Sequence, residues 1–252
     1  MNVLVTGASG QLGQRIVSYL LSNGIHVSTL GRNKISDKIA NHPWSLGMSP
    51  NPQSFKDIDF ILHLAWSTKD RGDLDFHLNV GGSAKIMEAS RLSGIKMINI
   101  SSLATINPIS HYGKAKKIVE ELNLDGINLR IAKIEDSTLS RSENLIKRSV
   151  RKIIFLPIPR DLSVQVIEID NALNEIIKFI EGNHAPGIYE LPFNTCTLRA
   201  YLKNYHGLKS FAAPTFLLKV FFYGCQSSRT RIGKVAYDRW VSLISTHQAL
   251  SN

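Results

Sequence analysis

Cysteine is almost absent from this chain of 252 residues, which contains only Cys196 and Cys225. Two cysteines are too few for a disulfide framework or for a tetrahedral metal site, and their spacing matches no metal-binding motif. We therefore expect no bound metal, and we expect ordinary thiols at both positions.

Long apolar runs are missing as well. The longest, residues 211–225, is interrupted by Pro214 and Lys219 and is shorter than the roughly 20 residues that a membrane span needs. Residues 1–10 lack the basic start and the uninterrupted apolar core of a signal peptide. These absences predict a cytoplasmic protein without a transmembrane segment. Residues 211–225 are expected to form a buried or interfacial helix, which would pack on the protein's own core, across a homodimer or on a membrane surface.

Acidic residues are few compared with basic ones. The chain has 20 aspartates and glutamates and 30 lysines and arginines, which gives a net charge of +10. This balance attracts anions, among which phosphate-bearing small molecules compete with nucleic acid and anionic lipid. The basic residues are scattered, and they are not interleaved with aromatic residues as on a nucleic-acid platform. We therefore predict no nucleic-acid partner and expect most of these charges on a solvated surface.

Short apolar runs alternate with segments of helical spacing along most of the chain. The predicted strands are residues 2–6, 25–30, 59–64, 96–100, 127–131 and 164–169. The predicted helices are residues 12–21, 74–79, 83–92, 112–122 and 171–181, and residues 31–56 are expected to be mostly loop. Strand and helix in alternation predict an α/β fold, a doubly wound parallel sheet of the Rossmann type.

Two segments do not fit the alternation, residues 135–163 and residues 183–252. Both follow the carboxyl ends of predicted strands, where ligands bind in open α/β sheets. We expect these segments to fold together as a small C-terminal substrate-binding subdomain. The dinucleotide-binding Rossmann domain would then comprise residues 1–134 and 164–182.

Glycines punctuate residues 6–13 (TGASGQLG), directly after the first predicted strand. A strand, such a loop and a helix in succession are typical of dinucleotide binding. Gly7 would allow the tight turn, Gly10 the approach of the backbone to a pyrophosphate, and Gly13 the close packing of helix on strand. A glycine-rich turn without a ligand is the alternative. The cofactor contacts expected here are Gly7, Ser9, Gly10, Gln11, Leu12 and Gly13.

The end of the second predicted strand bears on which dinucleotide binds. An acidic residue there would bind the ribose hydroxyls of NAD, whereas an arginine favours the 2′-phosphate of NADP. Arg32 stands at this position, and the nearest acid, Asp37, lies several residues further on. We therefore expect NADP(H) to be preferred over NAD(H), against the alternative that Arg32 is only a solvated loop charge.

Tyr112 and Lys116 lie four residues apart on a predicted helix and so share one face of it. A nearby ammonium, joined by the positive charge of an oxidised cofactor, stabilises a phenolate and lowers the pKa of the tyrosine. Tyr112 could then exchange a proton with a carbonyl or hydroxyl group. Ser102, at the end of the fourth strand, would hydrogen-bond the same oxygen. The alternatives are a surface pair and a serine that caps a strand.

In their order along the chain, these motifs resemble the extended short-chain dehydrogenase/reductase family, the NAD(P)-dependent epimerases and dehydratases that act on nucleotide sugars. Residues 63–66 (HLAW), 79–83 (NVGGS) and 129–131 (LRI) match further motifs of the family, and the resemblance covers residues 1–182, with a weak continuation at 187–190. It implies Ser102, Tyr112 and Lys116 as catalytic residues and a role in polysaccharide biosynthesis. It also implies further cofactor contacts from Leu64, Ala65, Trp66, Asn79, Tyr112, Lys116 and Ile131.

The chain departs from that family in places that bear on its substrate. Leu103 and Ala104 stand where the dehydratases of the family carry acidic residues, which disfavours dehydration. Lys133 stands where many members have an asparagine-containing substrate motif, and the connection from Ser102 to Tyr112 is short. A nucleotide diphosphate could be held by basic residues further along the chain, namely Arg148, Arg151, Arg229 and Arg231.

The first functional hypothesis is therefore an NADPH-dependent ketoreductase of a nucleotide-linked sugar, because Arg32 favours NADP and the acids for dehydration are missing. A nucleotide-sugar epimerase is the close alternative, since it would use the same catalytic residues. A non-catalytic NADP(H)-sensing protein ranks lower because Tyr112 and Lys116 are both present. A peripheral membrane or assembly role would rest on residues 211–225 alone.

Overall fold

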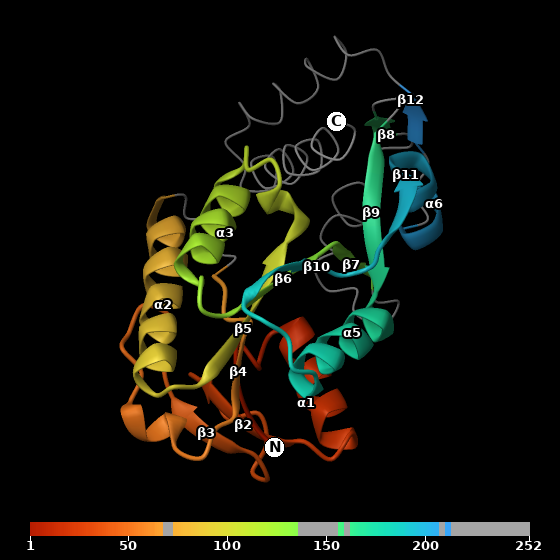
Figure 1. Cartoon of the computed structure of the whole chain (residues 1–252). Helices are drawn as coiled ribbons and strands as arrows, with labels where there is room; N and C mark the ends of the chain where they lie inside the picture. The colour runs from red at the N-terminus through yellow and green to blue at the C-terminus, as the bar shows by residue number, and fades with distance from the viewer. Residues whose placement is uncertain (68–72, 136–155, 159–161, 207–209, 213–252) are drawn as a thin grey trace.

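A seven-stranded parallel sheet forms the centre of the computed structural model, which describes residues 1–67, 73–135, 156–158, 162–206 and 210–212 (Figure 1). In sheet order the strands are β10 (Gly187–Glu190), β6 (Ile127–Ile131), β5 (Lys96–Ser102), β4 (Phe60–His63), β1 (Asn2–Thr6), β2 (His26–Gly31) and β3 (Ala40–Pro43). The order runs outward from β1 in both directions. The predicted doubly wound parallel sheet is confirmed.

Two pairs of helices cover the two faces of this sheet. Helices α1 (Gln11–Ser22) and α5 (Ile169–Glu181) pack on one face, and α2 (Asp73–Leu92) and α3 (His111–Leu122) pack on the other (Figure 1). Successive side chains of a strand point to opposite faces, so each strand supplies both cores. In β1, for example, Val3 and Val5 join the core under α1, whereas Leu4 joins the core under α2.

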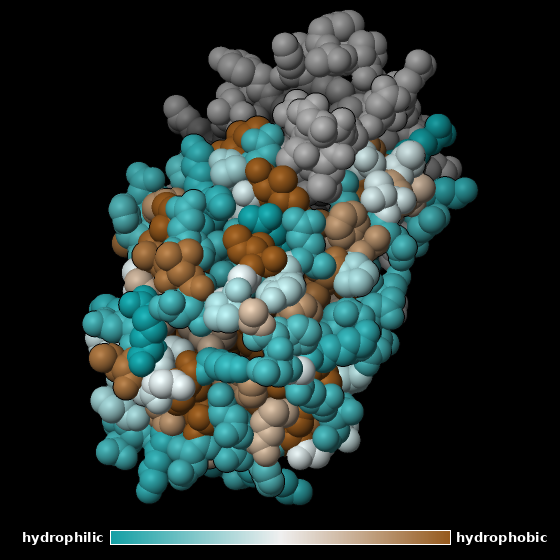
Figure 2. Space-filling view, in the orientation of Figure 1, coloured by the Kyte–Doolittle hydropathy of each residue, from teal (hydrophilic) through white to brown (hydrophobic). Residues whose placement is uncertain are grey.

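Smaller elements complete the described part of the chain. The strands β11 (Asn194–Thr197), β9 (Ser163–Glu168) and β7 (Lys133–Glu135) form a three-stranded sheet, and β12 (Ser210–Ala212) pairs with β8 (Leu156–Ile158). Helix α6 (Leu198–His206) closes a third apolar core with β9. Two short 3₁₀ helices, η1 (Pro52–Phe55) and η2 (Leu103–Thr105), lie in connections of the main sheet. In the view of Figure 2, hydrophilic residues cover most of the coloured surface.

Several predicted elements need correction. The strand predicted at 164–169 exists as β9 but belongs to the three-stranded sheet, and β10, inside the segment predicted for the small subdomain, is an edge strand of the main sheet. An apolar pattern marks a strand without naming its neighbour, which is why both placements differ from expectation. The division into two domains remains a prediction. Residues 31–56 are mostly loop, as expected, and also contain the short elements β3 and η1.

The two helices predicted between 74 and 92 form one continuous helix, α2. A Cβ on Gly82 would lie 2.6 Å from the Leu46 side chain and 2.7 Å from the backbone of Gly47. This glycine therefore serves the close packing of α2 against the preceding loop and does not interrupt the helix.

Some expectations concern residues that lie outside the described ranges. These are residues 213–225 of the apolar segment and four basic residues suggested for a nucleotide diphosphate, Arg148, Arg151, Arg229 and Arg231. Within the described ranges, no helix has the length and the apolar character that a membrane crossing requires.

Candidate active site

The candidate residues gather at the carboxyl edge of the main sheet because the strands that precede them are parallel neighbours. In register, Thr6 at the end of β1 pairs with His63 at the end of β4, and Ser102 at the end of β5 pairs with Ile131 at the end of β6. The glycine loop, the HLAW segment and Ser102 thus emerge at the same edge, which is where ligands bind in such sheets.

The glycine loop is shaped by two close contacts. Gly7 has a φ of +71°, and a Cβ there would lie 2.7 Å from the backbone nitrogen of Ala65, so no other residue fits without movement of the backbone. A Cβ on Gly13 would lie 2.3 Å from the carbonyl oxygen of Gly7. Both glycines therefore let the loop that connects β1 to α1 pack tightly against the residues that follow β4.

The N-terminus of α1 is open to an anion. Gly10 is its N-cap residue, so no side chain caps the first turn, and that turn contains no acidic residue. Ser9, Gly10 and Gln11 are exposed. The unpaired N–H groups and the helix dipole make such an end favourable for a phosphate group. This geometry fits the pyrophosphate of a dinucleotide.

A buried chain of hydrogen bonds joins the ends of β1 and β4 to α2. The Thr6 hydroxyl accepts hydrogen bonds from the backbone N–H groups of Leu64 and Ala65, both at 3.1 Å, and lies 2.8 Å from Nδ1 of His63. Since its lone pairs are engaged, Thr6 donates its proton to Nδ1. His63 is then the neutral Nε2–H tautomer, which donates to the Ser83 hydroxyl at 2.9 Å.

The environment keeps His63 neutral. Its burial and, secondarily, the nearby Lys116 charge lower its pKa from 6.5 to about 3. The sequence motif indicated the neighbouring residues as cofactor contacts but not the role of His63 itself. The Thr6, His63 and Ser83 chain instead holds the HLAW segment against the glycine loop.

Asn79 supports the segment that follows β4. Its Oδ1 accepts a hydrogen bond from the Ser67 N–H at 2.7 Å, and its Nδ2 donates to the Ser67 carbonyl at 3.1 Å. The residue is 3% exposed. Asn79 therefore fixes the backbone just beyond Trp66, while a direct contact with a cofactor remains a prediction.

Ser102, Tyr112 and Lys116 converge around Trp66. The rings of Trp66 and Tyr112 meet edge to face, with centroids 5.7 Å apart, and Nζ of Lys116 lies 3.9 Å from the centroid of the Trp66 ring. Nζ also donates a hydrogen bond to the carbonyl of Ile100 at 2.6 Å. The Ser102 side chain interacts with Tyr112 by hydrogen bonding. The structure thus brings Ser102, Tyr112 and Lys116 together beside Trp66.

The ionisation of this pair differs from the expectation. Burial lowers the pKa of Lys116 to about 7, and the charge of Glu120 opposes that shift. Burial raises the pKa of Tyr112, and the interaction that lowers it in part is with Ser102. The expected lowering by Lys116 is not found, because Lys116, with a pKa of about 7, has lost its positive charge at the higher pH at which the phenol ionises. Since Tyr112 is still 41% exposed, a ligand can reach it.

The remaining predicted contacts differ in accessibility. Arg32 follows β2 and is exposed, and in the described residues it has no side-chain partner, whereas Asp37 pairs with Lys34 at 2.9 Å. Ile131 is only 4% exposed, so it supports the site as a core residue beside Ser102. Leu64 is partly exposed.

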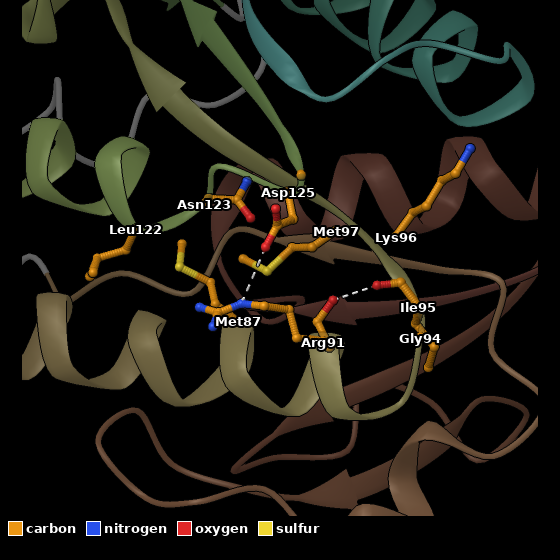
Figure 3. A pocket seen from close by; sticks show the side chains of 11 residues that line it. Met87, Arg91, Gly94, Ile95, Lys96, Met97, Leu122, Asn123 and Asp125 are labelled. Atoms are coloured by element: carbon orange, nitrogen blue, oxygen red, sulfur yellow. Dashed lines mark hydrogen bonds and ion pairs between the residues drawn. The ribbon is translucent and has the colours of Figure 1, made fainter.

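A cavity of about 270 Å³ lies elsewhere, near the amino end of β5 (Figure 3). Met87 and Met97 contribute apolar walls, and Arg91 and Asp125 form an ion pair of 3.8 Å beside it. None of the candidate residues lines it, so it is separate from the site at the carboxyl edge.

The comparison with known families agrees with this arrangement, because the model of the NAD dependent epimerase/dehydratase family matches residues 3–127. Residues 3–127 belong to the NAD dependent epimerase/dehydratase family. This result confirms the family resemblance seen in the motifs. The matched region includes the glycine loop, Ser102, Tyr112 and Lys116.

Individual relatives of this family are distant. A relative from Stigmatella aurantiaca is named 4-hydroxy-2-methyl-3-oxo-4-farnesyl-3,4-dihydroquinoline-1-oxide ketoreductase. It is 32% identical to this chain over 119 residues, which cover 42% of this chain and 35% of that protein. The chain spans 20% to 35% of the length of the curated relatives that it matches.

Solved structures show the same fold at lower identity. The enzyme WbmG of Bordetella bronchiseptica, in complex with NAD and UDP, has a TM-score of 0.68 and 15% identity, over 84% of this chain and 80% of that one. A UDP-glucose 4-epimerase of Thermotoga maritima with UDP-glucose has a TM-score of 0.64 and 19% identity, over 85% and 87%.

Proposed function

We propose that this protein is an NADPH-dependent oxidoreductase that reduces a keto group of a nucleotide-linked sugar. The observation that carries the proposal is the grouping of Ser102, Tyr112 and Lys116 beside the glycine loop at one sheet edge. Proton transfer to a carbonyl oxygen can use these three groups, namely the Ser102 hydroxyl, the Tyr112 phenol and the Lys116 ammonium.

The chain's own residues supply the acid. NADPH, when bound, would supply the hydride. Because the pKa of Tyr112 is raised, its phenol is protonated at neutral pH and can donate to the oxygen that becomes the product hydroxyl. The Ser102 hydroxyl, which interacts with the same phenol, can hydrogen-bond that oxygen and orient it. A protonated phenol suits reduction better than oxidation, where Tyr112 would have to accept a proton.

The cofactor preference rests on Arg32. Its exposed side chain, without a partner in the described residues, follows the strand end where a 2′-phosphate would lie. The acid that could select NAD, Asp37, is paired with Lys34. The open first turn of α1 would hold the pyrophosphate, and Gly7 and Gly13 keep that turn in place.

Three observations support the reaction and substrate class. The Stigmatella relative is named a ketoreductase, and WbmG was solved with NAD and UDP. The absence of acids at Leu103 and Ala104 disfavours dehydration. A nucleotide-sugar epimerase is the second candidate, favoured by the family and by the Thermotoga epimerase. It would retain NAD and change the configuration of its sugar without net consumption of the cofactor.

The Tyr112→Phe variant tests the proposal. NADPH oxidation is followed by its absorbance with a 4-keto derivative of a UDP-sugar, and the cofactor affinity is measured separately. We expect turnover to fall at least about 100-fold while NADPH binding stays within a factor of a few. Tyr189→Phe is the matched control, since it removes a hydroxyl that donates to the Ala185 carbonyl at 2.9 Å. Unchanged turnover in Tyr112→Phe would refute the assigned role.

A further inference from the structure

A carboxylate lies on the same face of α3 as the candidate catalytic pair. Tyr112, Lys116 and Glu120 follow one another at intervals of four residues, so each lies one turn beyond the last. Glu120 is only 1% exposed, although it is charged. A buried carboxylate needs partners that compensate for its lost hydration.

Glu120 has four such hydrogen bonds, and they come from two strands and a 3₁₀ helix. Nε and Nη2 of Arg130, on β6, donate to its two oxygens at 3.0 and 2.9 Å. The Ser101 hydroxyl donates at 2.6 Å, and the Thr105 hydroxyl lies 2.9 Å from Oε1. Burial alone would raise the pKa of Glu120, but these partners, above all Arg130, lower it.

The contacts flank the candidate catalytic serine on both sides. Ser101 precedes Ser102 directly, and Thr105 also lies 2.8 Å from the Ser102 carbonyl, so its single proton is divided between two acceptors. The helix with Tyr112 and the strand end with Ser102 are therefore joined through one carboxylate.

We propose that Glu120 is a positioning residue of this site, which fixes α3 against the end of β5 and places a negative charge one helical turn beyond Lys116. The inference rests on the proposed function in that Ser102, Tyr112 and Lys116 are taken as the reacting groups. The carboxylate itself touches none of the reacting atoms and acts through its neighbours.

The charges around Lys116 show why the carboxylate matters. In the described residues, the titratable groups that interact electrostatically with Lys116 are His63 from β4 and Glu120 from its own helix. Tyr112 lies one helical turn away from Lys116. His63 is neutral and Tyr112 is protonated, so Glu120 provides the negative charge among the three. Arg130 neutralises part of it, and Glu190 on β10 shares Arg130 at 3.3 Å.

The experiment measures the protonation of Lys116 directly, in the full chain without cofactor or substrate. The ¹³Cε chemical shift of Lys116 is followed against pH and assigned by its loss in Lys116→Met. In the wild type we expect a midpoint near 7. In Glu120→Gln we expect the midpoint to fall by roughly one pH unit, because an opposite charge is removed.

The matched control is Glu190→Gln, which removes the outer partner of Arg130 but leaves Glu120 in place. We expect its Lys116 midpoint to equal that of the wild type. Equal midpoints in Glu120→Gln and the wild type would overturn the proposal.

Circular dichroism first establishes that each variant is folded. If Glu120→Gln does not fold, Glu120→Asp provides the test. Its shorter side chain draws the charge away from Lys116, so the Lys116 midpoint should fall by less than in Glu120→Gln. An unchanged midpoint would again overturn the inference. A loss of stability without any shift would show a purely structural role and count against it. Because the midpoint is read without cofactor, it decides this inference separately from the reductase activity.

Discussion

His63 gives the structure a defined sensitivity to acid, which the His63→Gln variant should remove. The imidazole is 1% exposed and connects Thr6 to Ser83 as a neutral group. Glutamine is also neutral and has a donor and an acceptor, but it does not titrate. The variant therefore separates the hydrogen bonds of this position from its ionisation.

The magnitude follows from the lowered pKa. The pKa of His63 is about 3 in the folded chain, against an ordinary value of 6.5. As the pH falls through this window, the unfolded chain takes up a proton that the folded chain does not, so the folded state loses stability. Between pH 7 and pH 4 this loss amounts to about 3 kcal/mol from His63 alone.

Urea unfolding, followed by circular dichroism at several pH values from 7 to 4, measures the effect. At pH 7 we expect His63→Gln to be less stable than the wild type by about 1–3 kcal/mol, because two buried hydrogen bonds lose their geometry. That difference should shrink or reverse at pH 4, since only the wild type carries the histidine penalty. All other titrating groups cancel in the comparison. Parallel stability curves for the two proteins would show that His63 does not cause the loss of stability in acid.

Two further predictions concern the scaffold of the site. Gly13→Ala should lower the free energy of unfolding by at least about 2 kcal/mol, because its Cβ would meet the Gly7 carbonyl oxygen. The control Gly81→Ala, whose Cβ would have nothing within 4 Å, should be neutral or stabilise α2 by about 0.5–1 kcal/mol. Equal effects of the two substitutions in thermal unfolding would contradict this prediction. Asn79→Ala leaves both backbone groups of Ser67 without this partner and should lower the stability by about 1–3 kcal/mol, and an unaltered melting temperature would count against the role of Asn79.

Local patterns predicted the parts of the fold that depend on local chemistry. The strands at 2–6 and 127–131 agree with β1 and β6 in both bounds, because an apolar run between turn residues is a strong signal. The spacing of Tyr112 and Lys116 correctly indicated one helix face. The position of β9 in a separate sheet could not be predicted, since strand pairing is set by tertiary packing.

The hydrogen-bond partners within the site were also beyond local patterns. Thr6 and His63 are 57 residues apart, and nothing in either neighbourhood indicates that they meet. The spacing of Glu120 from Lys116 could have nominated it as a third residue on the helix face, but its partner Arg130 comes from the next strand. The lowered pKa of Lys116 follows from this burial, which a single sequence does not show.

We propose that the carboxyl edge of the main sheet binds a nicotinamide dinucleotide with a preference for the 2′-phosphate. Titration of the purified protein with NADPH and with NADH, followed by nicotinamide fluorescence after a check for cofactor that co-purifies, tests it most directly. We predict exchangeable binding that is tighter for NADPH, and a loss of this preference in Arg32→Ala. Binding of neither dinucleotide would contradict a dinucleotide site at this edge, and retained NAD with no affinity for NADPH would contradict the proposed cofactor and favour the epimerase.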